Sequence, residues 1–422
     1  GPMCWLCGVA ASQMPRRGKH VCGLIRSEFA SYEHCSQCYE GDYQYGVEAG
    51  APIGDVRTLG QRLYLVGTWN AWSTCEELIE TAEGVYSGEF ALGETCVEQF
   101  HIVLDKDHQK AIVPAVVRAG TSARISEPCA ERGRHWLVDG RRDGVAPGTR
   151  YEVTFAWSDT EKAITWMPAP KAEAEREPTA KEGRAGAASS RYRHTYSLVG
   201  SLTGGKPEDL VPSTEFPDCW EWTGKLRKMR EFGFHLMRDH DPMQLIYPLT
   251  SMPSDRSVPV MGPDEGGMGK DWSVPGRTGD QVRVQLRFEE GDITVEVTAP
   301  GLGCMCWKSL PGSCREVYSV VGSWSGYASM RMEASPDDVY KAWFAIGSSG
   351  HEEFQLAVNE SQDLRFYPAR ALAAPGEAPL CGPDGRGEEL LWQVAGPPGQ
   401  WIEIVLNLSA QDRSSMVTCH TA

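Results

Sequence analysis

The chain has 422 residues, of which 41% are hydrophobic and 23% charged, so two to four domains of roughly 100–200 residues are expected. The formal net charge of −16 disfavours general binding to nucleic-acid phosphates or to an anionic membrane surface. No apolar run reaches the ~18 residues that a membrane span needs. We therefore expect a multidomain protein whose partners are neither nucleic acid nor membrane.

Residues 3–60 form a cysteine-rich leader with two Cys-x-x-Cys pairs, Cys4 with Cys7 and Cys35 with Cys38. Two thiolates three residues apart can turn around one ion, and two such turns complete the tetrahedral coordination of a structural zinc. The alternative is a leader with reduced thiols and no metal. We expect no other cofactor.

Most of the 14 cysteines are scattered, which is typical of buried or free thiols rather than of a disulfide framework. No signal peptide is visible at the start of the sequence. These two observations favour an intracellular protein, located in the cytoplasm or a plastid.

A short phrase follows a tyrosine three times in the rest of the chain. It occupies residues 65–73, where it reads Leu-Val-Gly-Thr-Trp-Asn-Ala-Trp-Ser, and returns in shorter or altered form at residues 198–203 and 320–327. So long a period indicates repeated domains rather than a solenoid. We place the three repeats at residues 61–167, 193–298 and 315–419. Residues 168–192 have almost no large apolar side chains and predict a flexible linker, and residues 299–314 predict a second, cysteine-containing linker.

Short segments of alternating apolar and polar residues, separated by turn signals, fill each repeat. In the first repeat the expected strands are residues 63–66, 84–90, 98–104, 111–114, 135–138, 151–157 and 163–166. About seven short strands in about 100 residues predict an all-β fold of three tandem immunoglobulin-like antiparallel β-sandwich domains.

Alternation also predicts which side chains face the core. In the first repeat these are Val66, Phe90, Phe100, Ile102 and Leu104. One late tryptophan recurs in register in all three repeats, and we expect it to be a core residue because aromatic side chains dominate packing. These tryptophans are Trp136, Trp272 and Trp392.

The first repeat opens with a characteristic order of elements: a turn over residues 67–73, a strand over residues 85–90 and a strand over residues 98–104. In this order the opening half of each repeat resembles the starch- and glycogen-binding carbohydrate-binding modules, especially the glycogen-binding module of AMP-activated kinase β subunits. The resemblance covers about half of each repeat and implies a β-sandwich that binds α-glucan.

The resemblance also implies which residues would contact a sugar. The glucan-stacking aromatic of the turn falls on Trp72, with Asn70 beside it, in the first repeat and on Tyr327 in the third. The second repeat has no such platform at residues 202–206. The second stacking aromatic of these modules falls on Phe366 in the third repeat.

The two tryptophans of the first turn lie three residues apart, so one can point inward and the other outward. We expect Trp69 and, in the third repeat, Trp324 to pack inward, and Trp72 and Tyr327 to be exposed. The alternative is that all four side chains are packed, because tryptophan is highly buried on average.

Two functions remain open. One is a non-catalytic protein that binds α-glucan of the starch or glycogen type through tandem modules. The other is a protein–protein interaction scaffold or accessory subunit whose sandwiches have lost sugar binding, which the missing platform of the second repeat favours. The sequence contains no nucleophile elbow, metalloprotease histidine pair, phosphate loop or dinucleotide fingerprint, so we expect no enzymatic activity.

Overall fold

The computed structural model describes residues 60–422, except residues 116, 122, 127, 131–132, 158–161, 170–192, 217, 227–231, 313–314, 336–337 and 411. Of the preceding part it describes only the strands β1 (Leu24–Arg26) and β2 (Tyr32–His34), which pair antiparallel. The predicted zinc ligands Cys4, Cys7, Cys35 and Cys38 lie outside the described residues, as does most of the linker over residues 168–192. By its internal contacts the chain divides into two units, Gly1–Gly60 and Gln61–Ala422.

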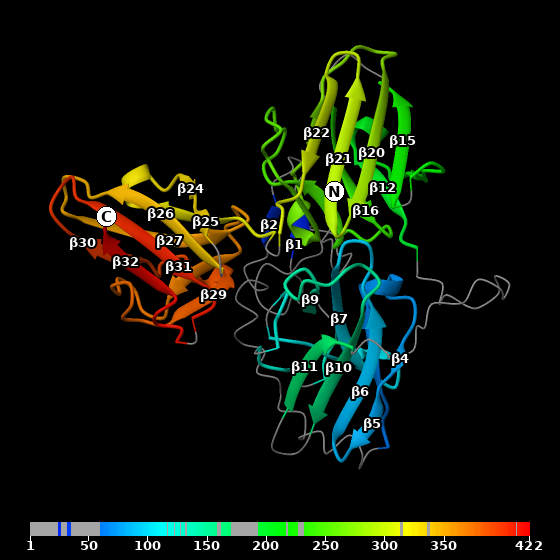
Figure 1. Cartoon of the computed structure of the whole chain (residues 1–422), viewed down its shortest axis with the longest axis horizontal. Coiled ribbons are helices and arrows are strands. Elements are labelled where there is room, and N and C mark those ends of the chain that lie inside the picture. Colours follow the sequence, from blue (N-terminus) through cyan, green and yellow to red (C-terminus); the bar gives the residue numbers. More distant parts are fainter. Residues whose placement is uncertain are drawn as a thin grey trace, which may run out of the picture. The chain divides into compact units, whose positions relative to one another are not determined.

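The second unit is built from antiparallel sheets that form three sandwich-like pairs (Figure 1), which confirms the predicted all-β architecture. Among the described residues the strands are interrupted only by single 3-10 turns and loops. In this part of the chain, no helix has the length and apolar character needed to cross a membrane.

The strands of the first sandwich are β3 (Leu63–Gly67), β4 (Glu76–Glu77), β5 (Ile79–Ala82), β6 (Val85–Ala91), β7 (Val97–Leu104), β8 (Asp107–Ile112), β9 (Trp136–Asp139), β10 (Arg150–Trp157) and β11 (Lys162–Pro168). One sheet has the order β4-β3-β7-β8, with β9 also on β7, and the other has the order β11-β10-β6-β5. Strands β4 and β5 were not predicted, because they are too short to show an alternating pattern.

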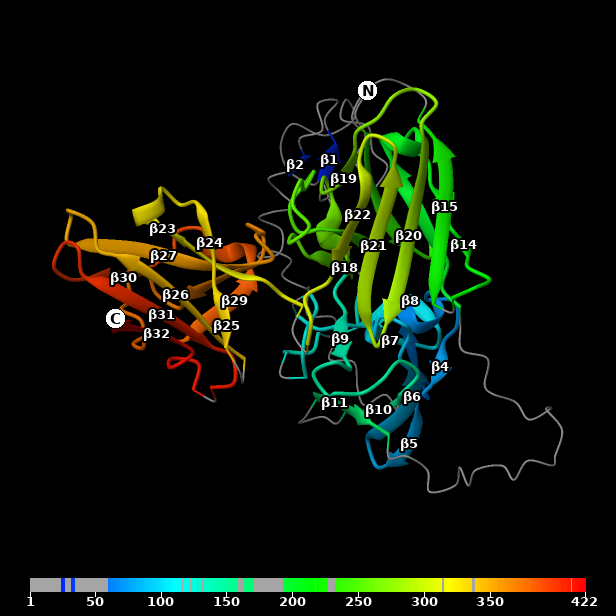
Figure 2. The ribbon, with the colours of Figure 1, turned by 45° about the horizontal axis from the view of Figure 1, so that its top comes forward.

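The strands of the second sandwich are β12 (Tyr196–Gly200), β13 (Glu208–Asp209), β14 (Val211–Pro212), β15 (Cys219–Lys225), β16 (Phe232–Arg238), β17 (Leu245–Pro248), β18 (Val260–Asp264), β19 (Trp272–Val274), β20 (Gln281–Glu289), β21 (Asp292–Ala299) and β22 (Gly303–Lys308). One sheet has the order β13-β12-β16-β17-β18, with β19 on β16. The other has the order β14-β15-β20-β21-β22, whose long central strands Figure 2 shows side by side.

Strand β22 corrects one sequence prediction. Residues 299–314 were expected to form a linker, but β22 pairs with β21 along its whole length and is an edge strand of the second sandwich. Its inward anchor is Trp307, which is 1% exposed, whereas Cys304 is exposed. The sequence pattern failed here because cysteine, methionine and tryptophan alternate too weakly in hydropathy to reveal a strand.

The strands of the third sandwich are β23 (Tyr318–Gly322), β24 (Ser329–Arg331), β25 (Glu333–Ser335), β26 (Val339–Ala345), β27 (His351–Val358), β28 (Arg365–Pro368), β29 (Leu380–Asp384), β30 (Trp392–Ala395), β31 (Trp401–Asn407) and β32 (Val417–Thr421). One sheet has the order β24-β23-β27-β28-β29, with β30 on β27, and the other has the order β25-β26-β31-β32.

The three sandwiches share one register at their centre. The glycine that ends the first strand lies opposite a phenylalanine of the central strand, and the same phenylalanine pairs with a tryptophan on its other side. The trios are Gly67 with Phe100 and Trp136, Gly200 with Phe234 and Trp272, and Gly322 with Phe354 and Trp392. All three tryptophans are 0% exposed, which confirms that they are core residues.

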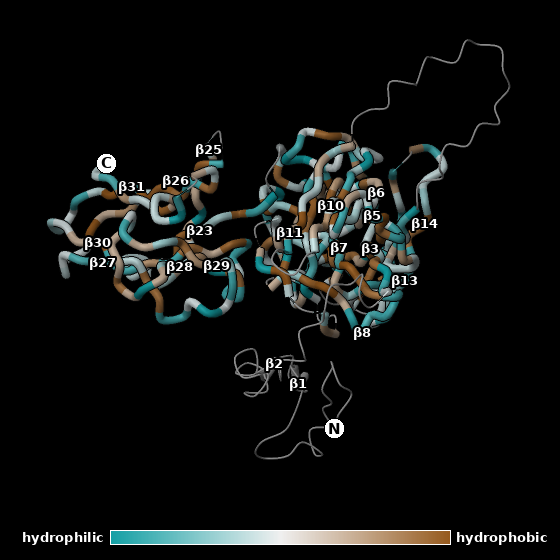
Figure 3. Tube along the Cα trace, turned by 90° about the horizontal axis from the view of Figure 1, so that it is seen from below, coloured by the Kyte–Doolittle hydropathy of each residue, from teal (hydrophilic) through white to brown (hydrophobic). Residues whose placement is uncertain are grey.

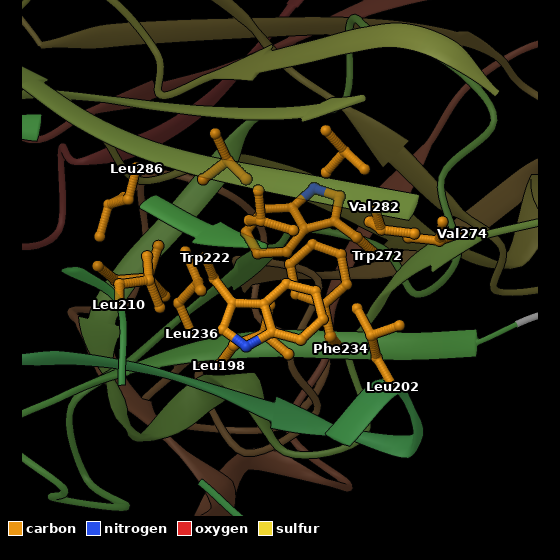
Figure 4. Close-up of a cluster of buried hydrophobic side chains, with 14 of the residues drawn as sticks. Leu198, Leu202, Leu210, Trp222, Phe234, Leu236, Trp272, Val274, Val282 and Leu286 are labelled. Carbon is orange, nitrogen blue, oxygen red and sulfur yellow. The ribbon is translucent and has the colours of Figure 1, made fainter. Parts of the chain in front are cut away.

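Alternation along the strands builds each core from inward-facing apolar side chains. In the second sandwich, Val282 and Leu286 of β20 lie in one core with Trp222 of the neighbouring strand β15 and with Phe234 and Trp272 of the facing sheet (Figure 4). Figure 3 shows the same alternation as brown and teal stretches interleaved along the trace of the chain. The five core residues predicted for the first sandwich are all buried: Val66, Phe90, Phe100, Ile102 and Leu104.

Candidate functional site

The repeated phrase forms a corner at the end of the first strand of each sandwich. There the chain makes a single 3-10 turn, at η2 (Thr68–Asn70), η3 (Ser201–Thr203) and η5 (Ser323–Ser325). The first hydroxyl of each turn accepts a hydrogen bond from an amide of the central strand: Gln99 N to Thr68 Oγ1 at 2.9 Å, Gly233 N to Ser201 Oγ at 2.9 Å, and Glu353 N to Ser323 Oγ at 3.0 Å. This bond fixes the corner to the sheet and explains why serine or threonine follows the glycine.

The first aromatic of the corner packs inward, as predicted. Trp69 is 7% exposed and stacks on Phe90 with ring centroids 4.3 Å apart. Its ring covers Gly67 so closely that a Cβ there would lie 2.1 Å from the indole. Trp324 is partly buried against the third core and covers Gly322 in the same way, at 2.3 Å. Glycine is therefore required at this position because the indole occupies the space of a side chain.

Trp72, the predicted stacking platform of the first repeat, is half-buried rather than exposed. Its ring lies against His101 and His135, with centroids 5.3 and 4.6 Å away. Its Nε1 donates a 3.0 Å hydrogen bond to Oδ2 of Asp241, which follows β16 in the second sandwich. The expectation that Trp72 is exposed was wrong, because the second sandwich supplies a partner that local sequence cannot reveal.

Two other predicted contact residues are buried. Asn70 is 8% exposed, and its Nδ2 donates to Thr74 Oγ1 at 2.5 Å and to Glu76 Oε1 at 3.3 Å. Burial raises the pKa of Glu76, although hydrogen bonds oppose this rise. Phe366 is 6% exposed and faces Tyr318 in the third core. Neither Asn70 nor Phe366 presents its side chain for contact with a sugar in this conformation.

Tyr327 differs from Trp72 although both occupy the same backbone position. Each has a left-handed backbone, with φ of 63° and 58°, and each amide donates a 2.9 Å hydrogen bond to the glycine carbonyl that precedes the turn. The Tyr327 side chain is 51% exposed, as predicted. In the second sandwich the same position is Gly205, whose amide donates a 2.7 Å hydrogen bond to the Gly200 carbonyl, and Leu202 takes the buried place of Trp69. Of the three corners, the third is therefore the one with an exposed aromatic ring.

An aromatic surface that we did not predict lies on the outer face of the sheet β25-β26-β31-β32. Trp401 is 57% exposed at the start of β31, and Trp343 of β26 is half-buried. The register places Trp401 opposite Ala345 and Trp343 opposite Glu403, so the two tryptophans are diagonal neighbours on one face, about 7 Å apart. Two indoles on a flat sheet face form a surface suited to stacking against planar or ring-shaped ligands.

Polar groups surround this pair of tryptophans. Lys341 Nζ lies 3.0 Å from Glu403 Oε1, and both side chains are only partly exposed. On β32, His420 lies opposite Glu403, and its Nε2 lies 3.0 Å from Thr418 Oγ1. The face thus combines apolar rings with hydrogen-bonding groups, as carbohydrate recognition requires. We call Trp343, Trp401, Lys341, Glu403 and His420 the outer-face cluster.

The sequence contained a signal for the outer-face cluster. In β26, Tyr340 and Phe344 are buried and in phase with each other, so Trp343 falls on the opposite face of the strand. Trp401 is likewise out of phase with the buried Ile402 and Ile404 of β31. Large aromatic residues on the polar phase of a strand are the pattern that sequence reasoning missed.

A larger hollow of about 480 Å³ lies between the first and second sandwiches. Its exposed aromatic residue is Phe216, which is 46% exposed. The guanidinium of Arg287 lies 5.1 Å above that ring, so a cation–π contact already uses one face of the phenylalanine. The outer-face cluster therefore offers more free aromatic surface than this hollow.

A buried ion pair joins the first sandwich to the second. Arg238 Nη2 lies 3.5 Å from Glu98 Oε2, and these side chains are 1% and 0% exposed. Glu98 also accepts hydrogen bonds from Thr68 Oγ1 at 2.5 Å and Gly93 N at 2.8 Å, while Arg238 donates to Gln244 at 2.7 Å. Burial alone would lower the pKa of Arg238, but Glu98 together with the neighbouring Tyr196, Glu94 and Asp239 outweighs burial and raises that pKa. The contact between the first and second sandwiches therefore includes a buried ion pair, in addition to the hydrogen bond from Trp72 to Asp241.

Among the described residues, no three or more histidine, cysteine, aspartate or glutamate side chains are grouped so that they could hold a metal ion. The tetrathiolate of Cys4, Cys7, Cys35 and Cys38 remains a prediction, because these residues lie outside the described part.

Comparisons with known proteins found three matching chains among solved structures. The chain matches no family model, and no curated protein matches it. It is similar to the crystal structure of SusF from Bacteroides thetaiotaomicron, with 11% sequence identity and a TM-score of 0.20, over 85% of this chain and 71% of that chain. A TM-score this low supports no argument about fold or function. The assignment of three β-sandwiches depends on the strand pairing of this chain alone.

Proposed function

We propose that the chain is a non-catalytic carbohydrate-binding protein, that its ligand is an α-glucan of the starch or glycogen type, and that the third sandwich holds the binding site. The observation that carries this proposal is the exposure of Trp401, at 57%, beside Trp343 on one sheet face. Exposed indoles are costly to leave in water, and a pyranose ring covers an indole with its apolar face while its hydroxyls reach polar neighbours. The choice of α-glucan comes from the resemblance of the corner turn to glycogen-binding modules.

The third corner supports the same proposal. Tyr327 is 51% exposed at the position where the resemblance places the glucan-stacking aromatic, whereas Trp72 is occupied by His101, His135 and Asp241. Sugar contact through the first corner would require the joint between two sandwiches to open. We therefore assign binding to the third sandwich and a structural role to the first two corners.

Affinity electrophoresis of the full chain in gels containing glycogen, soluble starch or a β-glucan tests the proposal. We expect the α-glucans to retard the chain, and Trp401→Ala or Tyr327→Ala to lose most of that retardation. If only Trp401→Ala loses retardation, the glucan binds at the outer-face cluster. If only Tyr327→Ala loses it, the glucan binds at the third corner. An intact chain that migrates equally in all gels would exclude glucan binding.

A second candidate function is a protein–protein interaction scaffold. It is favoured by the use of Trp72 for packing and by Gly205 at the equivalent position of the second corner, since two of the three sandwiches then lack a free aromatic corner. Affinity purification from source cells followed by mass spectrometry distinguishes it: a stoichiometric protein partner that survives glucan-degrading enzymes supports the scaffold. An intracellular location also remains a proposal, and the free thiols of the described cysteines support it.

A further inference from the structure

A small cavity of about 60 Å³ is lined by residues from all three sandwiches. One water needs roughly 10–15 Å³ of such volume, so the cavity is large enough for several waters or one small ion. Its cationic lining residues are Arg118, Arg141, Arg142 and Arg315, and its anionic ones are Asp139, Asp264 and Glu316. Two further carboxylates, Glu265 and Asp292, pair with Arg118 and Arg315 from outside the lining, so what distinguishes the cavity is its hydrogen-bond donors and not its net charge.

Each of these four arginines lies within 4 Å of a carboxylate, and Arg141 and Arg118 are also hydrogen-bonded to one. Arg141 makes two hydrogen bonds to Asp139, of 2.8 and 2.6 Å. Arg118 makes two bonds to Glu265, of 3.1 and 2.8 Å, and also lies 3.4 Å from Asp264. The third pair is Arg142 with Glu316, at 3.7 Å. Most of the negative charge in the cavity wall is therefore already matched.

Arg315 is different. Its side chain is 7% exposed, and Nε, Nη1 and Nη2 are all buried without a hydrogen-bond partner among the described residues. Asp292 faces it at 3.7 Å, as Glu316 faces Arg142, and this distance makes an ion pair but no hydrogen bond. Arg141 Nη1, on the same cavity, is also buried and unpartnered. Buried polar groups nearly always have partners, so this concentration of unused N–H donors points to a ligand that supplies acceptors.

We propose that the cavity binds one small tetrahedral oxyanion, a phosphate or phosphoryl group, and that Arg315 and Arg141 are its ligands. Guanidinium groups match the oxygen spacing of phosphate with parallel N–H donors, and the cavity offers donors that no carboxylate uses. Burial and the neighbouring charge of Arg141 lower the pKa of Arg315 to about 9, although Asp139 and Asp292 oppose this fall.

The site links segments that are distant in sequence. Arg141 follows β9 in the first sandwich, and Arg315 precedes β23, the first strand of the third. An oxyanion held by both would bind the folded arrangement and not the unfolded chain, so it would stabilise the fold by mass action. The phosphoryl group could come from inorganic phosphate or from a phosphate ester of a sugar, and the experiment separates these two sources.

Equilibrium dialysis of the full chain against radiolabelled inorganic phosphate, in a buffer free of other oxyanions, tests the proposal. We expect about one phosphate per chain and a rise of several degrees in Tm at saturation. Glucose 6-phosphate as competitor distinguishes the sources: displacement of the label with equal or higher affinity assigns the ester, and failure to displace it assigns the free ion. Absence of saturable binding for both ligands means that the cavity holds water only, and overturns the proposal.

Arg315→Met keeps the apolar stem and removes the donors. We expect at least a tenfold weaker affinity for phosphate and a Tm without phosphate that is unchanged or higher, because a buried charge with no hydrogen-bond partner among the described residues is removed. Arg283→Met, at an exposed arginine paired with Glu221, is the matched control and should bind like the original chain. If Arg315→Met does not fold, Arg141→Met replaces it. Unchanged phosphate affinity in a folded variant at either position overturns the proposal.

Discussion

Trp72 Nε1 donates a 3.0 Å hydrogen bond to Asp241 Oδ2, and the two residues belong to different sandwiches. The indole also packs against His101 and His135. A ring held in this way cannot at the same time stack on a sugar. The most recognisable aromatic residue of the sequence motif is therefore part of a joint between domains.

Replacement of Trp72 is expected to affect stability and not glycan binding. For Trp72→Ala we expect the free energy of unfolding to fall by about 2–3 kcal/mol, somewhat below the range for fully buried aromatics because the ring is half-buried. Chemical denaturation of the full chain measures this. Tyr327→Ala is the matched variant, since its ring is 51% exposed and its stability should change by no more than ~0.5 kcal/mol. Equal stability of the two variants would contradict the packing described for Trp72.

The buried pair of Arg238 and Glu98 leads to a second prediction. Arg238→Met leaves the Glu98 carboxylate buried without its cation, and we expect a loss of about 3–5 kcal/mol in the free energy of unfolding. The exposed pair of Arg283 and Glu221 provides the control, because Arg283→Met should cost less than about 1 kcal/mol. The double variant that adds Glu98→Gln should recover part of the loss. A strictly additive double variant would mean that the two groups do not interact.

A third prediction concerns acid stability. Burial alone would raise the pKa of Asp239, but the hydrogen bond from His194, at 2.6 Å, the Thr195 amide and the charges of His194 and Arg238 together outweigh burial. They hold that pKa below the ordinary value of 3.8. A carboxyl with a lowered pKa stabilises the fold above its unfolded pKa and loses this contribution as the pH falls through the folded value. We expect the free energy of unfolding to fall as the pH drops below about 4.

Urea denaturation at a series of pH values checks this expectation. Asp239→Asn should flatten the acid part of the profile, because the residue can no longer take up a proton on unfolding. Asp363→Asn, at an exposed aspartate, should leave the slope unchanged. Identical slopes for all three proteins would show that Asp239 does not contribute to the acid dependence.

The glycine beneath the corner indole gives a fourth prediction. In Gly67→Ala the new Cβ would lie 2.1 Å from the Trp69 ring, so the indole would have to leave its stack on Phe90. We expect a loss of about 1–3 kcal/mol, the range for overpacked sites. Gly120→Ala is the control, because no atom lies within 4 Å of its added Cβ. Thermal unfolding of both variants should show a lower Tm only for Gly67→Ala.

The cysteine-rich leader gives a fifth prediction, which depends on the sequence alone. We expect about one equivalent of zinc per chain, held by Cys4, Cys7, Cys35 and Cys38, and its loss on substitution of one cysteine from each pair by serine. Elemental analysis by mass spectrometry after purification without added metal measures this. Substitution of Cys304, an exposed thiol of β22, should leave the zinc content unchanged. A clean preparation with far less than one equivalent would contradict the tetrathiolate.

Much of the fold could be predicted because its pattern is local. The strand expected over residues 98–104 is β7, and the late tryptophans are buried in all three copies. Period-2 alternation and turn residues carry this information within a few positions of each strand. Very short strands such as β4, and the weakly patterned β22, do not show it and were missed.

The candidate site was less predictable because it depends on contacts between distant residues. Trp72 and Asp241 are 169 positions apart, and nothing in the corner motif distinguishes a free indole from one that a neighbouring domain covers. Phe366 was assigned by resemblance, yet it lies in the core. The phase of Trp401 relative to Ile402 indicates an outward side chain, but the family resemblance places the sugar contacts at the turn and at Phe366.

The closed corner of the first sandwich has a consequence for valency. With Trp72 packed between two sandwiches and Gly205 at the equivalent position of the second corner, the glucan binding that we propose is confined to one sandwich of the three. The gain in apparent affinity that tandem modules obtain from effective concentration is then not available within one molecule. Firm attachment to a branched polysaccharide would have to come from many chains on the same particle.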